Sequence, residues 1–306
     1  MHRRSRIVSL LLAAVVLALT SSTEASAAFP GQPNTIVFWS HRNGQADLFK
    51  MKANGNGQRI IGAGFANAFP GQLSPDGSRV TFVSDSGMGT GFDVWVADVD
   101  GANAMELTSF DGFFFDPSWN PAGTKIVFSV YTAATSSLEV FTVNANGGTP
   151  KRITDTPKID EYQPVWSPEG RWIVVSANND NDAVFNYDLY RYASDGSRRM
   201  RITDTPKRYE GSPDFSADGN RVSFVSAGGS GQGDVMTMKL DGMVARNVTK
   251  NVGVDVTQAI WLPNGRIAFG GRPVGEDIEI WTISADGSGR DRLTFNGQDD
   301  DLSEVT

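Results

Sequence analysis

The stretch from Pro164 to Thr203, PVWSPEGRWIVVSANNDNDAVFNYDLYRYASDGSRRMRIT, contains the pattern that decides the fold. A short apolar segment, PVW, precedes a Ser-Pro-Glu-Gly turn and the apolar run WIVV. A second apolar segment, LYRY, leads to a turn at Gly196 and then to the pair Ile202-Thr203. Short segments of alternating apolar and polar residues, bounded by glycine-containing turns, are typical of half-buried β-strands. The stretch therefore predicts four short strands separated by tight turns.

The same pattern recurs along the whole chain. The first turn is found at Ser74–Gly77, Asn120–Gly123, Ser167–Gly170, Ser216–Gly219 and Leu262–Gly265. The glycine of the second turn is found at Gly55, Gly101, Gly147, Gly196, Gly242 and Gly287. The closing threonine is found at Thr108, Thr154, Thr203, Thr249 and Thr294. Each series has a spacing of 45 to 49 residues. Four antiparallel strands per repeat predict an all-β, six-bladed β-propeller of four-stranded blades.

The two ends of the chain are predicted to close this propeller together. Thr35 enters a strand directly, so the first repeat lacks its own inner strand, and Glu304–Thr306 aligns with Pro164–Trp166 of the fourth repeat. We expect residues 301–306 to pair beside the strand that begins near Thr35, which leaves no open edge. The alternative is an unpaired C-terminal tail, because chain ends are often poorly ordered.

The repeat resembles a known family. The Ser-Pro-Asp-Gly turn at Ser74–Gly77, the apolar strand after it, the Asp-Gly turn and the closing Leu-Thr pair are similar to the WD40-like PD40 repeats of TolB-like propellers. The resemblance extends from about Asn34 to the C-terminus. It implies a single propeller domain over residues 29–306.

Residues 1–28 have the features of a signal peptide. Arg3, Arg4 and Arg6 precede an apolar run from Ile7 to Leu19, and small residues follow up to Ala27 and Ala28. A run of this length is short for a membrane span, although an uncleaved anchor is the alternative. Cleavage would remove three arginines and one glutamate and take the formal charge from −8 to −10. We expect a secreted or periplasmic cell-envelope protein, monomeric, without a later transmembrane segment and without affinity for nucleic acid.

Composition excludes several kinds of chemistry. The chain has no cysteine, and its two histidines are His2 and His41. Disulfide bonds, a thiol nucleophile and a metal site built on several histidines are therefore excluded. The serine-hydrolase motif Gly-x-Ser-x-Gly is also absent.

Candidate binding residues cluster at one end of the predicted inner strands. They are Phe114, Asp160, Glu161, Tyr162, Tyr209, Glu210, Asp255, Asp300 and Asp301. Carboxylates beside aromatic rings are suited to a cation, a sugar or a basic peptide. The alternative is that they are ordinary loop residues whose rings fill the channel. A metal site is considered only at Asp180 and Asp182, in an Asn/Asp-rich loop that is suited to Ca²⁺. No other cofactor is expected.

Two further series are predicted to be structural. An acidic residue occurs once per repeat, eight residues before the second-turn glycine, at Asp47, Asp93, Glu139, Asp188, Asp234 and Glu279. Strict recurrence favours a role in the fold, through hydrogen bonds to the nearby loop backbone. Trp119, Trp166 and Trp261 occupy one equivalent position and are predicted to be buried between blades.

The functional hypothesis is a non-catalytic binding or scaffold module, acting through the acidic and aromatic face at the channel mouth. Its partner would be an envelope or extracellular protein or peptide, or a glycan. The alternative is a carbohydrate-active enzyme, a glycoside hydrolase or lyase, that uses a pair such as Glu161 and Glu210 as acid and base. Two carboxylates in an open pocket would favour the enzyme, and a filled channel mouth would favour the binding module.

Overall fold

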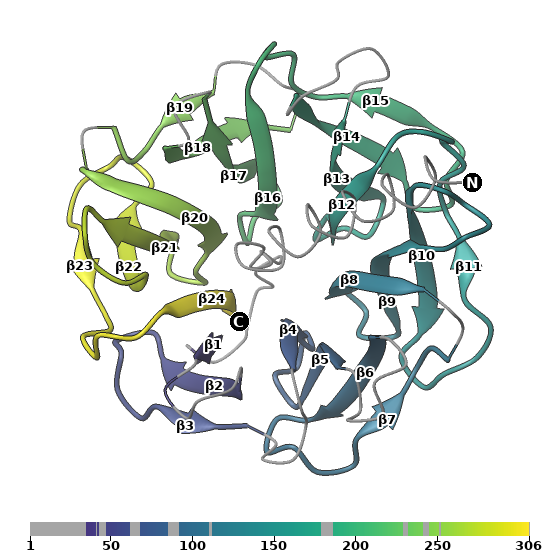
Figure 1. Ribbon diagram of the computed structural model, residues 1–306, viewed down its shortest axis with the longest axis horizontal. Coiled ribbons are helices and arrows are strands. Elements are labelled where there is room, and N and C mark those ends of the chain that lie inside the picture. The colour runs from purple at the N-terminus through teal and green to yellow at the C-terminus, as the bar shows by residue number, and fades with distance from the viewer. Residues whose placement is uncertain are drawn as a thin grey trace, which may run out of the picture.

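The computed structural model describes residues 35–40, 42, 47–61, 68–84, 92–109, 112–178, 186–228, 232–240, 245–250 and 252–305. In these residues the chain forms the strands β1 to β24 and no helix. The sheets surround a common centre, and the strands nearest to it are β4, β8, β12, β16, β20 and β24 (Figure 1). The protein is therefore an all-β propeller, as the repeats predict. No helix in the described ranges is long and apolar enough to cross a membrane.

Four of the sheets have four strands each. The first has the order β24 (Asp300–Val305), β1 (Thr35–Ser40), β2 (Asp47–Lys52) and β3 (Arg59–Ile60). The next has β4 (Phe69–Leu73), β5 (Arg79–Ser84), β6 (Asp93–Asp98) and β7 (Met105–Glu106). A third has β8 (Phe113–Trp119), β9 (Lys125–Tyr131), β10 (Leu138–Asn144) and β11 (Lys151–Arg152). A fourth has β20 (Val254–Trp261), β21 (Arg266–Pro273), β22 (Glu279–Ser284) and β23 (Asp291–Arg292).

The remaining strands form one larger sheet where the sequence predicts two separate ones. One half consists of β12 (Glu161–Trp166), β13 (Trp172–Asn178), β14 (Tyr187–Ala193) and β15 (Arg199–Arg201). The other half consists of β16 (Tyr209–Phe215), β17 (Arg221–Ala227), β18 (Gly233–Lys239) and β19 (Arg246–Asn247). The halves join because Tyr187 pairs with Tyr209 in parallel, with the Tyr187 N–H donating to the Arg208 carbonyl at 3.2 Å.

The expected closure by the two ends of the chain is confirmed. Strand β24 pairs antiparallel with β1, with Ile36 opposite Val305 and Ser40 opposite Asp300. The Arg42 guanidinium donates to both carboxylate oxygens of Asp300, at 2.8 and 2.9 Å. The same guanidinium lies 4.6 Å from the centre of the Phe49 ring. An ion pair and a cation–π contact therefore support the main-chain pairing of the closing strand.

Glycine is required at the turns for two physical reasons. Gly170 has φ = +71° and donates to the Ser167 carbonyl at 2.8 Å, while the Ser167 hydroxyl accepts from the Trp172 N–H at 3.0 Å. Gly196 has φ = +85°, and a Cβ there would lie 2.3 Å from the Ile153 carbonyl oxygen of the neighbouring sheet. A side chain at Gly196 would therefore meet both backbone strain and a clash with main chain.

The recurring acidic residues are structural, and they explain the recurring threonines. The Thr154 hydroxyl donates to Glu139 Oε2 at 2.8 Å and accepts from the Val140 N–H at 2.9 Å. The same acid–threonine bond is made by Thr108 with Asp93, Thr203 with Asp188, Thr249 with Asp234 and Thr294 with Glu279. A main-chain bond from the Thr156 N–H to Glu139 matches the expected contact with loop backbone. The threonine therefore joins the outer strand to the start of the strand beside it.

Side chains of the inner strands link neighbouring sheets. The Gln163 N–H donates to Asp116 Oδ2 at 2.9 Å, and the Ser212 N–H donates to Gln163 Oε1 at 2.7 Å. These three residues have positive φ angles, and each lies where the inner strand bulges. The Trp261 N–H donates to Asp214 Oδ2 at 2.5 Å. Such bonds replace the main-chain ladder that separate sheets lack.

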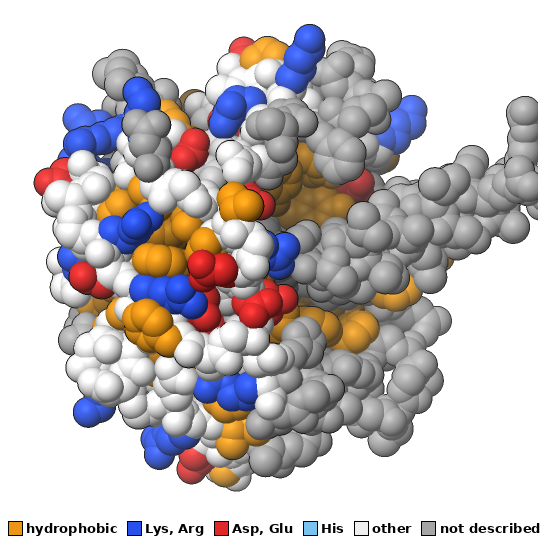
Figure 2. Space-filling view, turned by 60° about the vertical axis from the view of Figure 1, so that its left-hand side comes forward, with side chains coloured by type: hydrophobic (Ala, Val, Ile, Leu, Met, Phe, Trp, Pro, Cys, Tyr) orange, Lys and Arg blue, Asp and Glu red, His pale blue; other side chains and the backbone are white. Residues whose placement is uncertain are grey.

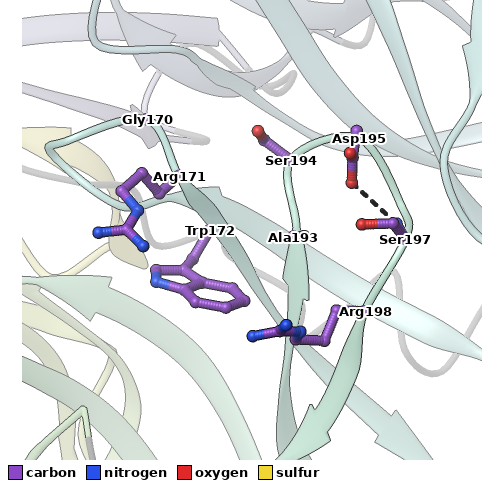
Figure 3. Close-up of a pocket in the computed structure, with 8 residues that line it drawn as sticks. All are labelled: Gly170, Arg171, Trp172, Ala193, Ser194, Asp195, Ser197 and Arg198. Carbon is purple, nitrogen blue, oxygen red and sulfur yellow. Dashed lines mark hydrogen bonds between the residues drawn. The ribbon is translucent and has the colours of Figure 1, made fainter.

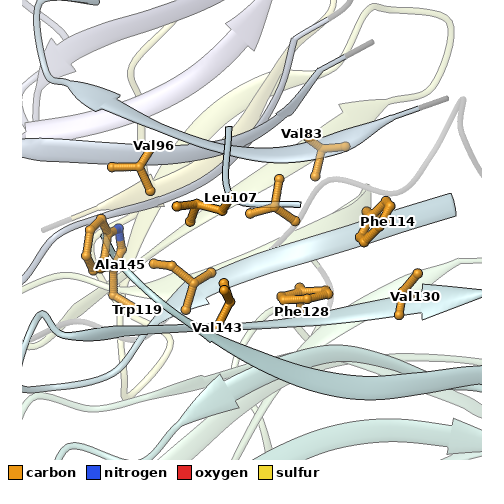
Figure 4. Close-up of a cluster of buried hydrophobic side chains, with 11 residues drawn as sticks. Val83, Val96, Leu107, Phe114, Trp119, Phe128, Val130, Val143 and Ala145 are labelled. Atoms are coloured by element: carbon orange, nitrogen blue, oxygen red, sulfur yellow. The ribbon is translucent and has the colours of Figure 1, made fainter. Parts of the chain in front are cut away.

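The three tryptophans are buried between sheets, as predicted. Trp119, Trp166 and Trp261 are 0%, 4% and 3% exposed. Trp119 packs in a cluster that includes Val83 and Val96 of the preceding sheet (Figure 4). Trp166 and Trp261 likewise share clusters with residues of the half-sheet or sheet before them. Tryptophan therefore fills the space that two adjacent sheets leave between them.

We expect Trp166→Ala to lower the free energy of unfolding by about 3–5 kcal/mol, because it leaves a cavity in this packing. Val274→Ala is the control, since Val274 is 89% exposed and its truncation should change stability by less than about 0.5 kcal/mol. Urea unfolding followed by fluorescence measures both. Equal stability of the two variants would contradict the packing role.

Candidate functional site

The predicted site residues lie near the start of the inner strands, as the repeat register requires. Glu161 begins β12, Tyr209 begins β16 and Asp300 begins β24. Phe114 and Asp255 are the second residues of β8 and β20. These strands surround the centre of the propeller (Figure 1). The site residues therefore share one side of the propeller, which we call the channel face.

Most of these side chains do not form the open rim that the sequence predicts. The buried ones are Phe114 (2% exposed), Glu161 (0%), Glu210 (2%), Asp300 (0%) and Asp301 (1%). Phe114 packs in the apolar cluster around Trp119 (Figure 4). The side chains of these five residues turn into the space between strands, which leaves them little accessible surface. Asp160, Tyr162, Tyr209 and Asp255 are partly exposed.

Glu161 lies inside its half-sheet beside a second carboxylate. The Tyr192 hydroxyl donates to Glu161 Oε1. Burial raises the pKa of Glu161 to about 7, and the nearby Glu139 carboxylate raises it further, against hydrogen bonds that lower it. Glu139 in turn forms an ion pair with Arg152, with 2.9 Å between Arg152 Nη2 and Glu139 Oε1. The arginine therefore balances one of the two carboxylates, and a proton on Glu161 balances the other.

The same arrangement recurs in the next half-sheet. Glu210 accepts from the Thr205 hydroxyl at 2.7 Å, and burial raises its pKa. Asp188 lies near Glu210 and forms an ion pair with Arg201, with 2.6 Å between Arg201 Nη2 and Asp188 Oδ2. The buried acids of the predicted site therefore belong to the network that holds the sheets.

Asp160 and Asp255 connect neighbouring sheets. Asp160 Oδ1 accepts from the Leu138 N–H at 2.8 Å, and Asp255 Oδ1 accepts from the Gly233 N–H at 2.8 Å. Asp299 makes the equivalent bond with the Ile278 N–H. Each of these carboxylates thus accepts the N–H at the start of a strand in the sheet or half-sheet before it.

Three tyrosines form a partly accessible group on the channel face. We call Tyr162, Tyr187 and Tyr209 the tyrosine cluster; all three are half-buried. The Tyr162 and Tyr187 ring centres are 5.7 Å apart, and those of Tyr187 and Tyr209 are 5.5 Å apart, with edge-to-face geometry. Burial raises the pKa of Tyr187 to about 12 and those of Tyr162 and Tyr209 above their usual range. The three hydroxyls therefore stay protonated and able to donate at neutral pH.

Sequence reasoning missed Tyr187, although a signal was present. Tyr187 directly precedes Asp188 of the recurring acidic series, and the residues in its place elsewhere include Phe92 before Asp93. Phe92 and Phe69 form the same edge-to-face contact, with ring centres 5.6 Å apart, and Phe92 forms a parallel bridge with Phe113. The aromatic trio thus occurs twice, at equivalent positions of the repeat.

The remaining candidates are not placed by the structure. Asp180, Asp182 and His41 lie outside the described residues. Within the described ranges, no three histidine, cysteine or acidic side chains gather in a way that could hold a metal ion. The Ca²⁺ site stays a prediction.

Comparison with known proteins finds a family model that matches the middle of the chain. Residues 69–210 match the family model described as the TolB β-propeller domain, PD40. The Tol-Pal system protein TolB of Anaeromyxobacter dehalogenans (strain 2CP-1) is 38% identical over 84 residues. The match covers 28% of this chain and 19% of that relative, so the chain matches about a fifth of the relative's length.

Solved structures share the fold across most of the described chain. TolB from Acinetobacter baumannii has a TM-score of 0.75 at 17% identity, over 89% of this chain and 66% of that one. Oligogalacturonate lyase from Vibrio parahaemolyticus has a TM-score of 0.60 at 14% identity, over 89% of this chain and 77% of that one. The repeats, the sheets and these similarities define a β-propeller built from PD40 repeats. The family-model match and these similarities support a TolB-like propeller family for this chain.

The raised pKa of Glu161 predicts a specific dependence of stability on pH. The folded pKa of about 7 lies above the ordinary 4.5, so the folded state binds the proton more tightly and this group costs no stability below pH 4.5. As the pH rises from 4.5 through 7, ionising Glu161 should cost up to about 3 kcal/mol. We expect Glu161→Gln to lack this loss.

The measurement is urea unfolding of both proteins across that pH range. The difference in free energy of unfolding between them isolates Glu161 from other buried acids such as Asp214, whose pKa burial also raises. A difference that does not change with pH would contradict the assignment.

Proposed function

We propose that this TolB-like propeller is a non-catalytic binding module that contacts a basic peptide segment of an envelope or extracellular protein through the tyrosine cluster. The observation that carries the proposal is the meeting of three partly exposed rings at the junction between two halves of a sheet. Tyrosine supplies rigid contact area at low conformational cost and a hydroxyl that donates hydrogen bonds. A surface of this composition is typical of recognition.

Charge supports a cationic partner. The chain has a formal charge of −8, and the Asp160 carboxylate lies near Tyr162 and Tyr187. The faces of aromatic rings attract lysine and arginine side chains, and a nearby carboxylate strengthens this attraction. A glycan is the other class of ligand that such rings accommodate, and it would bind without the same dependence on salt.

We further propose that the propeller has six blades, closed by β24 and β1. The two halves of the eight-stranded sheet meet through one residue pair, and each half has four strands of its own. The inner strands contact one another in the order β4, β8, β12, β16, β20 and β24, and β24 contacts β4. Six repeats in the sequence agree with this count.

A location outside the cytoplasm, secreted or in the cell envelope, is part of the proposal. Two observations support it. Residues 1–28 have the composition of a signal peptide. A relative of this chain carries the name of a Tol-Pal system protein.

The enzyme alternative has less support. The similarity to an oligogalacturonate lyase, at 14% identity, concerns the fold alone. Glu161 and Glu210, the pair considered for acid–base chemistry, are buried and bonded to Tyr192 and Thr205. An acid–base pair must reach the glycosidic bond, and these side chains face the interior of the sheets.

We expect Tyr187→Ala and Tyr209→Ala to weaken binding of lysine- and arginine-rich peptides by at least about tenfold, since each removes a central aromatic contact. Binding is measured by calorimetry against short peptides of graded charge, at low and at raised salt. Tyr131→Ala is the control, because Tyr131 is also half-buried and lies outside the cluster. Salt-independent binding, or equal affinity in all three variants, would contradict the proposal.

The glutamates provide a second control. Glu161→Gln with Glu210→Gln removes two buried carboxyl groups and should alter stability while peptide affinity changes less than about threefold. Loss of peptide binding in a folded double variant would indicate that Glu161 and Glu210 take part in binding, and it would contradict the proposal.

A further inference from the structure

A shallow hollow of about 350 Å³ lies at the other end of β13 and β14 from the tyrosine cluster (Figure 3). Trp172, the first residue of β13, lies between the turn at Gly170 and the turn that follows Ala193. Strand β14 runs from Tyr187 in the tyrosine cluster to Ala193 at the hollow. The hollow is therefore on the opposite side of the propeller and does not depend on the proposed function.

Two exposed guanidinium groups flank the indole. The side chains of Arg171 and Arg198 lie on either side of Trp172 in Figure 3. Within the described part of the chain, neither guanidinium has a hydrogen-bond or ion-pair partner. Arg152 and Arg201 differ, because each is paired with a buried carboxylate. Positive charge at the hollow is thus free to meet an anionic ligand.

One face of the indole is covered by an arginine side chain. The Arg191 guanidinium lies 4.7 Å from the centre of the Trp172 ring, over its face. Arg191 also reaches Met200 Sδ at 3.4 Å. A ring fixed in this way offers a planar apolar surface at little cost in side-chain entropy. Flat C–H faces, such as those of pyranose sugars, stack on surfaces of this kind.

The far side of the hollow supplies acceptor and hydroxyl groups. The Ser197 N–H donates to Asp195 Oδ1 at 2.9 Å, and hydrogen bonds from Ser197 lower the pKa of Asp195. Ser194 lies beside them on the same turn (Figure 3). An ionised carboxylate at this position accepts hydrogen bonds from ligand hydroxyl groups, which inorganic phosphate dianion lacks.

We propose that this hollow binds an acidic sugar, a uronic acid residue of a glycan. Its carboxylate would pair with Arg171 and Arg198, its C–H face would stack on Trp172, and its hydroxyls would donate to Asp195. A neutral sugar leaves the two guanidinium groups unused, and a phosphate gains nothing from Asp195 or the indole. The combination of donors, acceptor and ring therefore selects a ligand that has both a carboxylate and hydroxyls.

The test uses the full chain with digalacturonate as the probe and its methyl ester as the neutral counterpart. We expect a Kd of about 1 mM for digalacturonate, as befits an open site, with at least about tenfold weaker binding of the ester. Arg171→Gln with Arg198→Gln should reduce affinity for the acid at least about tenfold and leave the ester unchanged. Lys239→Gln is the matched control, because Lys239 is exposed and takes in β18 the register position that Ala193 has in β14.

Three results would overturn the proposal. They are equal binding of acid and ester, unchanged affinity in the double arginine variant, and tighter binding of a short peptide with a free C-terminal carboxylate than of digalacturonate. Far-ultraviolet circular dichroism verifies that each variant is folded. Quenching of indole fluorescence by digalacturonate, absent in Trp172→Phe, gives a second readout at the hollow itself.

Discussion

The hydrogen bond between a threonine hydroxyl and a buried or half-buried carboxylate, made in five of the repeats, is the interaction on which the rest of the structure depends. It joins a very short outer strand to its neighbour and, at the same time, places a charge inside the protein. A buried charge needs a partner, and the arginine of the outer strand supplies it in the sheets of Glu139, Asp188 and Glu279. In the sheet of Asp93 that position is Glu106, and burial together with this carboxylate raises the pKa of Asp93 to about 6.

Acidic residues of the inner strands extend the same network toward the channel. Their oxygen atoms accept main-chain N–H groups of the neighbouring sheet, or hydroxyls within their own sheet. Glu161, Glu210, Asp300 and Asp301 are buried as a result, whereas the tyrosine cluster stays partly exposed. Carboxylates of the inner strands thus hold neighbouring sheets together, and the tyrosines lie at the junction between the two halves of the eight-stranded sheet. The side of the molecule that Figure 2 shows mixes acidic, basic and apolar side chains.

Structural features that recur with the period of the sequence repeat could be predicted from the sequence. The turn glycines recur in the repeats, the buried tryptophans occupy one equivalent position in three of them, and the pairing of β24 with β1 supplies the strand that the first repeat lacks. The burial of Glu161 and Glu210 could not be predicted, because a bulge follows each of them and shifts the alternation of side chains between faces. Tyr187 was hidden for another reason. It differs from its counterparts in other repeats, and its importance depends on Tyr162 and Tyr209, which are distant in sequence or belong to another repeat.

The pairing of β24 with β1 also sets an order of events during biosynthesis. Strand β1 begins at Thr35, and its partner is the segment from Asp300 to Val305, so more than 250 residues emerge between the two. Until the later segment is made, β1 keeps one open edge, and Arg42 lacks the Asp300 carboxylate to which it donates in the folded protein. The first sheet is thus the last to be completed, and a nascent chain remains an open arc with an edge that other strands can join.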